Sequence, residues 1–304
     1  MSQKMVQIRQ KQVFVSSPYS VSEVWASPII GRQNEMEMIT AAWMAGPNSL
    51  PLSPLLLGEP GVGKNRMVCE LARRTGKELF IFQGHEDVTS EDLACAIRFS
   101  DDATRKMDYL ISPLVTAMLS GDICFIDEIA KIRPRALALL VSVLDERRYI
   151  DSTLLGERVI AHPGFRFVAA TNTADLEGNA LPEFLRSRMR PVILMGYPAK
   201  EEIEQIVRFR HPRLNEQVVK LMDHFWVEWA RLSKDKPPTP RDAIYAFDLA
   251  LSLADFEAFG GFAKCGSEDT FSLDTKIMAD AVHEEKHLKR AIHELFRQNK
   301  LLSK

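Results

Sequence analysis

The chain has 304 residues, of which 46% are hydrophobic and 26% are charged, and its formal net charge is −2. These values are ordinary for a globular protein and leave room for a large core, or for a core domain with a smaller one. The near-neutral charge gives no electrostatic reason to expect nucleic acid or an anionic membrane as partner, and no apolar run approaches the roughly 18 residues of a membrane span.

The predicted elements alternate between strands and helices through the first two thirds of the chain. Residues 1–28 are expected to form an extended arm, and a helix over 33–45 is expected to end at Gly46-Pro47. Strands separated by helices predict a parallel sheet covered on both faces, so that 29–197 forms an α/β core. The expected strands are 55–57, 79–82, 123–127, 165–170 and 192–195, and the helices between them are 64–75, 92–97, 113–120 and 134–147.

Strand signals stop after Pro198, and the remainder of the chain reads as helices. We therefore expect a small all-helical domain, or lid, over 198–304. Within the core, a short turn between two β-like pieces over 149–158 predicts a hairpin insertion. The expected helices of the lid are 201–210, 216–232, 241–253 and 272–298.

A glycine-rich segment follows the first core strand and has the pattern of a phosphate-binding loop. Gly61 and Gly63 allow the backbone to turn tightly and to point its N–H groups at an anion. Lys64 supplies a point charge for the β- and γ-phosphates at the start of a helix whose dipole also favours anions. The residues expected to bind the nucleotide here are Gly58, Glu59, Pro60, Gly61, Val62, Gly63, Lys64, Asn65 and Arg66.

Asn65 is the one departure from the pattern G-x-x-x-x-G-K-[ST], whose last hydroxyl normally sits on Mg²⁺. Asparagine offers a carbonyl oxygen on a longer arm, which the strict octahedron of Mg²⁺ accommodates poorly. The hypothesis that follows is that ATP binds, while its hydrolysis is slow or needs a partner.

A second motif ends the strand 123–127 in two carboxylates. In open α/β sheets ligands bind at the carboxyl ends of strands, so Asp127 and Glu128 would reach the same edge as the phosphate loop. Asp127 is expected to hold Mg²⁺ together with Asn65, and Glu128 to polarise the attacking water. The alternative is a helix cap, since acidic residues favour helix starts.

A third motif ends the strand 165–170 in Thr171-Asn172. Asn172 is a candidate to hold the attacking water or to touch the γ-phosphate. The alternative is a turn-forming asparagine, which is a common role for this residue.

The order of these motifs resembles that of the AAA+ ATPases, and most of all their MoxR and dynein-related branch. The segments 112–118, 139–148 and 162–167 are also similar to that branch. The resemblance covers residues 29 to about 250. The motifs that carry it are Gly-Glu-Pro-Gly-Val-Gly-Lys at 58–64, Phe-Ile-Asp-Glu at 125–128, Ala-Ala-Thr-Asn at 169–172 and Leu-Pro-Glu-Phe-Leu-Arg-Ser-Arg at 181–188.

The resemblance implies further site residues. Arg188 and Arg186 would be arginine fingers that reach the nucleotide of a neighbouring subunit; the alternative is a basic surface cluster. Arg241 falls where the family's lid arginine senses the γ-phosphate; the alternative is a salt bridge at a helix start. Ile30 and Gly31 resemble the adenine-side segment, where Ile30 would pack on the base.

The resemblance also implies how such a protein works. Copies of the chain would form a homo-oligomeric ring, expected to be a hexamer, and ATP would move the lid against the core to remodel or activate a partner protein. The implied partner carries a von Willebrand A-type domain. The segments 84–111 and 149–160 are candidate partner-facing or pore-facing insertions, with ordinary loop variation as the alternative.

Two other classes of function stay open at this point. In the first, the chain is a binding module in which ATP is a structural ligand that orders an assembly, which Asn65 favours. In the second, less favoured, it is a nucleic-acid-directed motor, although the charge shows no basic stripe.

Near the end of the chain His283-Glu284-Glu285-Lys286-His287 matches the zinc-protease pattern H-E-x-x-H, and His293 has the spacing of a third ligand. We read this segment as a charged helix face, because a continuing helix would place His293 about 120° around the axis from His287.

The cysteines indicate a reducing compartment. The chain has four, with no C-x-x-C spacing, which argues against a zinc ribbon or a disulfide framework. The first residues are too polar for a secretory signal. The expected location is cytoplasmic.

Overall fold

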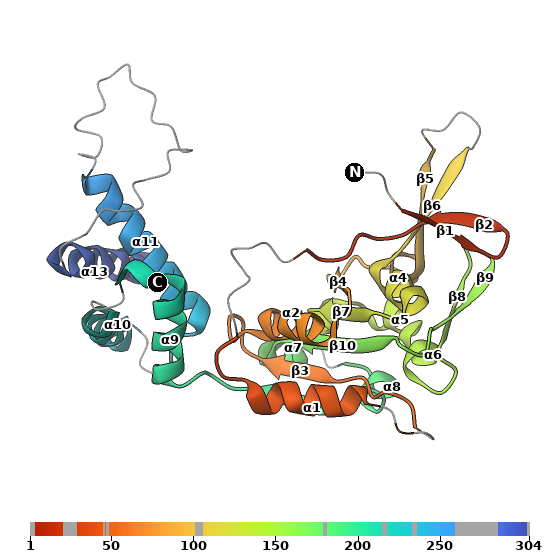
Figure 1. Cartoon of the computed structure of the whole chain (residues 1–304), viewed down its shortest axis with the longest axis horizontal. Helices are drawn as coiled ribbons and strands as arrows, with labels where there is room; N and C mark the ends of the chain where they lie inside the picture. Colours follow the sequence, from red (N-terminus) through yellow and green to blue (C-terminus); the bar gives the residue numbers. More distant parts are fainter. Residues whose placement is uncertain are drawn as a thin grey trace, which may run out of the picture. The chain divides into compact units, whose positions relative to one another are not determined.

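The computed structural model describes residues 4–20, 29–44, 46, 49–100, 106–178, 181–214, 218–232, 236–258 and 285–302. The chain divides into two compact units, Met1–Gly196 and Tyr197–Lys304, and each is described here by itself (Figure 1). Among the described residues, no helix combines the length and the apolar character that crossing a membrane requires.

A five-stranded parallel sheet forms the centre of the first unit, in the order β11-β3-β10-β7-β4 (Figure 1). Helices pack on both of its faces, so the predicted α/β fold is confirmed. The strands are β3 (Leu55–Gly58), β4 (Leu79–Gln83), β7 (Ile123–Asp127), β10 (Arg166–Thr171) and β11 (Val192–Met195).

The apolar runs of these strands feed two separate cores, because successive side chains of a strand point to opposite faces. Leu56 and Phe125 belong to the core under α1 (Gln33–Trp43) and α2 (Lys64–Thr75). Their neighbours Leu55, Cys124 and Ile126 belong to the core on the other face, which α4 (Pro113–Ser120) covers. Burial on both faces explains why the strands read as unbroken apolar runs.

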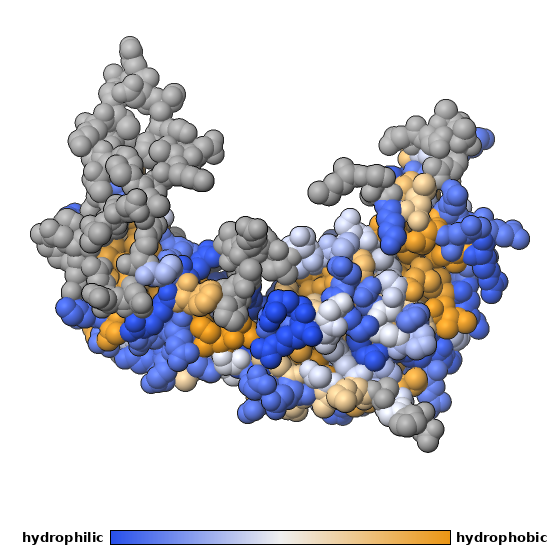
Figure 2. Space-filling model, in the orientation of Figure 1, coloured by the Kyte–Doolittle hydropathy of each residue, from blue (hydrophilic) through white to orange (hydrophobic). Residues whose placement is uncertain are grey.

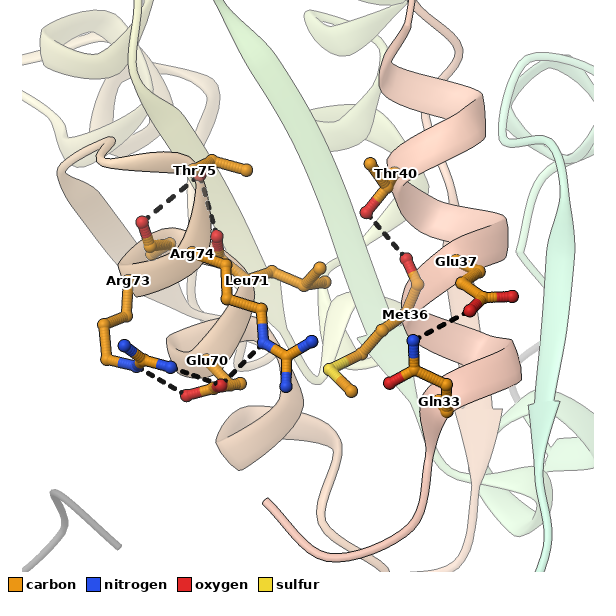
Figure 3. Close-up of polar contacts among 10 residues, drawn as sticks. Gln33, Met36, Glu37, Thr40, Glu70, Leu71, Arg73, Arg74 and Thr75 are labelled. Carbon is orange, nitrogen blue, oxygen red and sulfur yellow. Dashed lines mark hydrogen bonds and ion pairs between the residues drawn. The ribbon is translucent and has the colours of Figure 1, made fainter. Parts of the chain in front are cut away.

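Helix α2 follows the glycine-rich loop and is closed by internal contacts at its far end (Figure 3). Glu70 accepts hydrogen bonds from Arg73 and from Arg74, at 2.7–2.8 Å. The Arg73 guanidinium, with help from Arg74, lowers the pKa of Glu70 to about 2. Gly76 then ends the helix in the left-handed conformation (φ 65°) that glycine adopts most readily.

A second, four-stranded sheet has the order β1-β2-β6-β5 and corrects two predictions. The predicted extended arm contains a β-hairpin, β1 (Met5–Ile8) and β2 (Lys11–Phe14), and β2 pairs in parallel with β6 (Met107–Ile111). The predicted helix over 92–97 is a shorter helix, α3 (Ser90–Ala94), followed by strand β5 (Cys95–Phe99), which pairs with β6.

The remaining elements of the first unit include the predicted hairpin, which is confirmed as β8 (Tyr149–Ser152) and β9 (Glu157–Ile160). The predicted single helix over 134–147 is instead two short ones, α5 (Pro134–Leu137) and α6 (Leu140–Leu144). The shorter pieces around the strand ends are η2 (Ile129–Lys131), α7 (Thr173–Gly178) and α8 (Glu183–Arg186).

All the secondary-structure elements in the described part of the second unit are helices, as predicted. Phe225 lies in its core and packs against Trp229, Phe247 and Phe296 from three helices. Of the helix expected over 272–298, residues 272–284 lie outside the described residues. The helices are α9 (Lys200–Arg210), η3 (Pro212–Leu214), α10 (Val218–Leu232), α11 (Pro240–Ala258) and α13 (Glu285–Leu302).

Candidate nucleotide-binding site

The glycine-rich loop runs from the end of β3 to the start of α2. A Cβ on Gly58 would lie 2.5 Å from the carbonyl oxygen of Met195 on the neighbouring strand, so only glycine fits there. Gly61 (φ 87°) and Gly63 (φ 101°) both adopt the left-handed backbone region. Gly63 is the N-cap of α2 and has no side chain to cap the helix, whose first N–H groups and dipole favour an anion.

Lys64 points back into this loop. Its ammonium donates hydrogen bonds to Gly58 O (2.6 Å), Glu59 O (3.1 Å) and Asn172 Oδ1 (2.9 Å). The residue is buried, with only 7% of its surface exposed. A phosphate in the loop would therefore meet a lysine whose position is already fixed.

Asn172 joins the loop lysine to the acidic end of β7. Its Nδ2 lies 3.2 Å from both carboxylate oxygens of Glu128, and 3.0 Å from Asp175 Oδ2. Strands β7 and β10 are parallel neighbours, so their carboxyl ends meet at one edge of the sheet. The structure thus brings together Lys64, Glu128 and Asn172, one from each of the three sequence motifs.

Glu128 also pairs with Lys131, which the sequence reasoning missed. The ammonium of Lys131 lies 2.9 Å from Glu128 Oε2, and this carboxylate raises the pKa of Lys131. The available signal was the spacing of three residues, which places side chains on the same side of a helical turn. The Glu128 carboxylate is consequently held between a lysine and an amide.

Asp127 and Asn65 form a direct hydrogen bond. Asn65 Nδ2 donates to Asp127 Oδ2 at 2.7 Å, and the Glu128 N–H donates to Asp127 Oδ1 at 3.0 Å. Asn65 turns a donor, not an oxygen ligand, toward the carboxylate, so this pair does not fit a magnesium ion as it stands. In the described part of the chain, no group of three or more His, Cys, Asp or Glu residues is placed to hold a metal.

The backbone of Glu128 is left-handed (φ 56°, ψ 38°), an uncommon conformation for a non-glycine residue. Gly84, directly after β4, supports it by donating its N–H to Asp127 O at 2.8 Å. A Cβ on Gly84 would lie 2.5 Å from Glu128 O and 2.9 Å from Asp127 O. The sequence reasoning gave Gly84 no role, although a glycine directly after a core strand is a recognisable signal.

Gly84→Ala is therefore expected to destabilise the first unit by about 1–3 kcal/mol, because the added methyl group meets backbone that cannot rotate away. Gly196→Ala is the matched control, since a Cβ there has nothing within 4 Å. Thermal unfolding followed by circular dichroism would compare the two variants. Equal midpoints for both would contradict this reading of the Gly84 contact.

Segment 30–32, which resembles the family's adenine-side segment, contacts the loop through Arg32, whose contacts were not predicted. Arg32 Nη2 donates to Val62 O (3.2 Å) and to Gly196 O (2.6 Å), while its Nη1 pairs with Glu35 (3.0 Å). Gly31 before it has a φ of 71°, and Ile30 is half-buried. The segment therefore lies beside the loop.

Arg186 and Arg188, the predicted finger arginines, have partners outside the loop. Arg186 pairs with Glu183 (3.8 Å), and Arg188 donates to Phe184 O (2.6 Å) with its Nε 3.9 Å from Asp145 Oδ2. Neither pairs with the loop of its own chain. Arg241 is exposed in the first turn of α11, in the second unit.

The other predicted loop residues differ in exposure. Pro60 is exposed, Arg66 is half-buried and Val62 is buried in the core under α2. Glu59 accepts a hydrogen bond from Thr173 Oγ1 at 2.8 Å, so the loop is also tied to the segment after β10. Of the zinc-protease pattern, His283 lies outside the described residues, and His293 Nδ1 lies 3.3 Å from Glu228 Oε1.

The model of a known protein family, the AAA domain of the dynein-related subfamily, matches residues 53–189. These residues form a dynein-related AAA domain. The segment contains the loop, Asp127, Glu128, Asn172 and both predicted finger arginines. The resemblance to the AAA+ ATPases that the sequence suggested is thus confirmed.

Three curated proteins with similar sequences are CbbQ, NorQ and NirQ. Protein CbbQ of Hydrogenophilus thermoluteolus is 32% identical over 57% of this chain and 62% of its own length. Protein NorQ of Paracoccus denitrificans is 34% identical over 42% of this chain and 46% of its own. The denitrification regulatory protein NirQ of Stutzerimonas stutzeri is 31% identical over 62% of this chain and 66% of its own. The matched region spans less than two thirds of each relative.

Among solved structures, the Thermotoga maritima RuvB Holliday junction branch migration motor superposes with a TM-score of 0.53 and 16% identity. The match covers 88% of this chain and 70% of that one. At this identity the likeness shows the AAA+ fold, with its helical C-terminal region, and nothing about what this chain acts on.

Proposed function

We propose that this chain is a MoxR-like AAA+ ATPase that binds ATP at the loop 58–66 and hydrolyses it slowly. The observation that carries the proposal is the chain of contacts from Lys64 through Asn172 to Glu128, which joins the three motifs at one edge of the sheet. Membership of the AAA family supports nucleotide binding and implies ATPase activity.

Each residue would have a separate task in this reaction. Lys64 would bind the β- and γ-phosphates, Glu128 would polarise the attacking water, and Asn172 would orient that water or the γ-phosphate. Arg188, with Arg186, would act on the nucleotide of a neighbouring copy. Their ion pairs in their own chain are long, 3.8 Å from Arg186 to Glu183 and 3.9 Å from Arg188 to Asp145, so such an interface could replace them.

The base and the γ-phosphate would be contacted from two further segments. Ile30 and Gly31 would lie against the adenine, next to the loop that Arg32 anchors. Arg241, on the first helical turn of α11, would sense the γ-phosphate from the lid. Of the proposed division into an arm (1–28), a core (29–197) and a lid (198–304), the boundary between the units at Gly196 and Tyr197 supports the split between core and lid, while the arm belongs to the first unit.

The proposal extends to assembly and partner. Copies would form a hexameric ring that remodels or activates a partner protein with a von Willebrand A-type domain. The relative NirQ is a denitrification regulatory protein, which supports a regulatory role in general. Mass photometry with and without ATP tests the ring: a species that stays monomeric in both conditions would rule it out.

Exposed apolar side chains favour the two predicted insertions as the partner-facing surface. Phe99 and Met107 pair across β5 and β6 and are 85% and 50% exposed, and Ile160 on β9 is 67% exposed. Figure 2 shows apolar surface in the region of the four-stranded sheet and the β8–β9 hairpin. Isolated exposed apolar residues are common, but a cluster suits contact with protein better than contact with water.

A second candidate function is an assembly subunit in which ATP is structural and turns over negligibly. The hydrogen bond from Asn65 to Asp127 favours it, because this bond stands where the family's hydroxyl would serve the metal. Nucleic-acid-directed action has no comparable support in the charge of the chain.

Steady-state ATPase rates of wild type and Asn65→Thr test the proposal of slow hydrolysis. The hydroxyl that the family uses is restored in the variant, so its rate is expected to rise by about tenfold, a size typical of one well-placed polar contact. Asn65→Ala is the control, since it removes the amide without adding a hydroxyl. An unchanged or lower rate in Asn65→Thr would count against the proposal.

A further inference from the structure

Asn65 and Asp127 connect the end of the phosphate loop directly to the end of β7. The hydrogen bond between Asn65 Nδ2 and Asp127 Oδ2 is 2.7 Å long, and Asp127 is buried, with 8% of its surface exposed. An ionised carboxylate can only accept hydrogen bonds, so the amide nitrogen, and not the amide oxygen, faces it. The chemistry of the pair therefore fixes the orientation of the Asn65 amide.

This orientation competes with a cation. A metal at Asp127 would compete with two hydrogen bonds, since Oδ2 accepts from the Asn65 amide and Oδ1 accepts from the Glu128 N–H. Turning the amide over would give up this hydrogen bond and leave two acceptor oxygens face to face unless a cation lay between them. A serine or threonine at this position has no such conflict, because its hydroxyl oxygen offers lone pairs in any rotamer.

The amide also differs from a metal in charge. Its N–H group is only a dipole, so it satisfies Asp127 without adding a positive charge beside a triphosphate. The ammonium of Lys64, held at the loop by three acceptors, is then the buried positive charge that the loop offers a phosphate. A bound Mg²⁺ needs near-ideal octahedral geometry and loses its water ligands reluctantly. It therefore competes poorly for a carboxylate that already accepts hydrogen bonds.

We propose that the Asn65 amide takes the place of the magnesium ion at Asp127, so that this chain binds a nucleoside triphosphate with little contribution from magnesium. The inference rests on the proposed nucleotide site, and it makes Asn65 a positioning residue that acts through Asp127. It predicts a binding property that the family's serine or threonine would not produce.

Anisotropy titration of the full chain with a fluorescent ATP analogue, in millimolar magnesium or in EDTA, tests the inference. Wild type is expected to show dissociation constants within about threefold of each other in the two buffers. Asn65→Thr, which frees Asp127 and restores the hydroxyl, is expected to bind at least about tenfold more tightly with magnesium. Asn65→Ser is the second variant, and it should behave as Asn65→Thr does.

An independent readout is thermal stabilisation by unlabelled ATP, since a ligand that binds only the folded state stabilises it by RT ln(1 + [L]/Kd) and so raises the midpoint of unfolding. Wild type should be stabilised equally in EDTA and in magnesium, and Asn65→Thr mainly in magnesium. A wild-type affinity that rises tenfold with magnesium overturns the inference while leaving the nucleotide site intact. No saturable binding in either buffer overturns the proposed function, and the inference with it.

Discussion

Lys64→Ala is expected to weaken ATP binding by about 10- to 100-fold, since a charge-assisted hydrogen bond to phosphate contributes about 1.5–3 kcal/mol. The lysine is buried and held in place by the carbonyls of Gly58 and Glu59 and by Asn172, so little of its binding energy is lost in ordering the side chain. Titration of wild type and variant with ATP, followed by calorimetry, measures the effect.

Arg74→Ala is the matched control for this substitution. It removes one cation from the same helix, but at the far end, where Arg74 bonds to Glu70. The control should keep wild-type affinity for ATP. If Lys64→Ala and Arg74→Ala bind ATP equally well, the phosphate does not lie in this loop.

Glu128→Gln is expected to lower ATP turnover by about 100-fold or more while ATP still binds, because a positioned general base typically contributes 10²–10⁴-fold in rate. Glutamine keeps the size of the side chain and its contact with Asn172, but it cannot accept a proton from water. Single-turnover hydrolysis of radiolabelled ATP separates the chemical step from binding.

Asp122→Asn is the control, because Asp122 precedes β7 and therefore lies at the opposite end of the strand from Glu128. Its carboxylate accepts from the N–H of Glu78 at 3.1 Å, and asparagine can preserve that bond. Turnover in this variant should equal that of wild type. If Glu128→Gln also turns over ATP at the wild-type rate, the structural role for ATP becomes the better account.

The central sheet and its helices were predictable because their signals are local. Residues 55–57 and 123–126 are apolar runs, as expected of strands that are buried on both faces. Helix α2 was predicted to begin at Lys64 and end near Thr75, since glycines flank it on both sides. The contact between Lys64, Glu128 and Asn172 followed from the rule that parallel strands end at one edge.

The second sheet was not predictable in this way, because it depends on pairing between distant segments. The partner of β2 is β6, with Val13 beside Tyr109 and Phe14 beside Leu110. Neither segment alone shows a strong strand signal, so the segment that contains β2 was predicted to be part of an extended arm. Strand β5 was predicted as helix because its sequence shows no two-residue alternation of apolar and polar side chains. Its residues Ile97 and Phe99 are both exposed, so burial does not alternate along the strand either.

The contacts that shape the site were missed for a related reason. Arg32 and Gly84 act through backbone atoms: Arg32 bonds the carbonyls of Val62 and Gly196, and Gly84 lies against Glu128. Backbone acceptors have no letter in the sequence, so no motif records them. The hydrogen bond between Asn65 and Asp127 could not be predicted either. The sequence pattern marks position 65 as unusual, but it does not say which atom the amide contacts.

The lysine of the loop has a thermodynamic consequence of its own. Its ammonium donates hydrogen bonds to three oxygen atoms of the chain. A phosphate that binds the lysine would therefore replace some of these hydrogen bonds with its own. The enthalpy of binding is the difference between the hydrogen bonds that the lysine makes to the phosphate and those it makes to the chain. Little conformational entropy is lost, because the side chain is already held in place. The lysine then favours the anion whose oxygen atoms accept its hydrogen bonds better than two peptide carbonyls and an amide oxygen do.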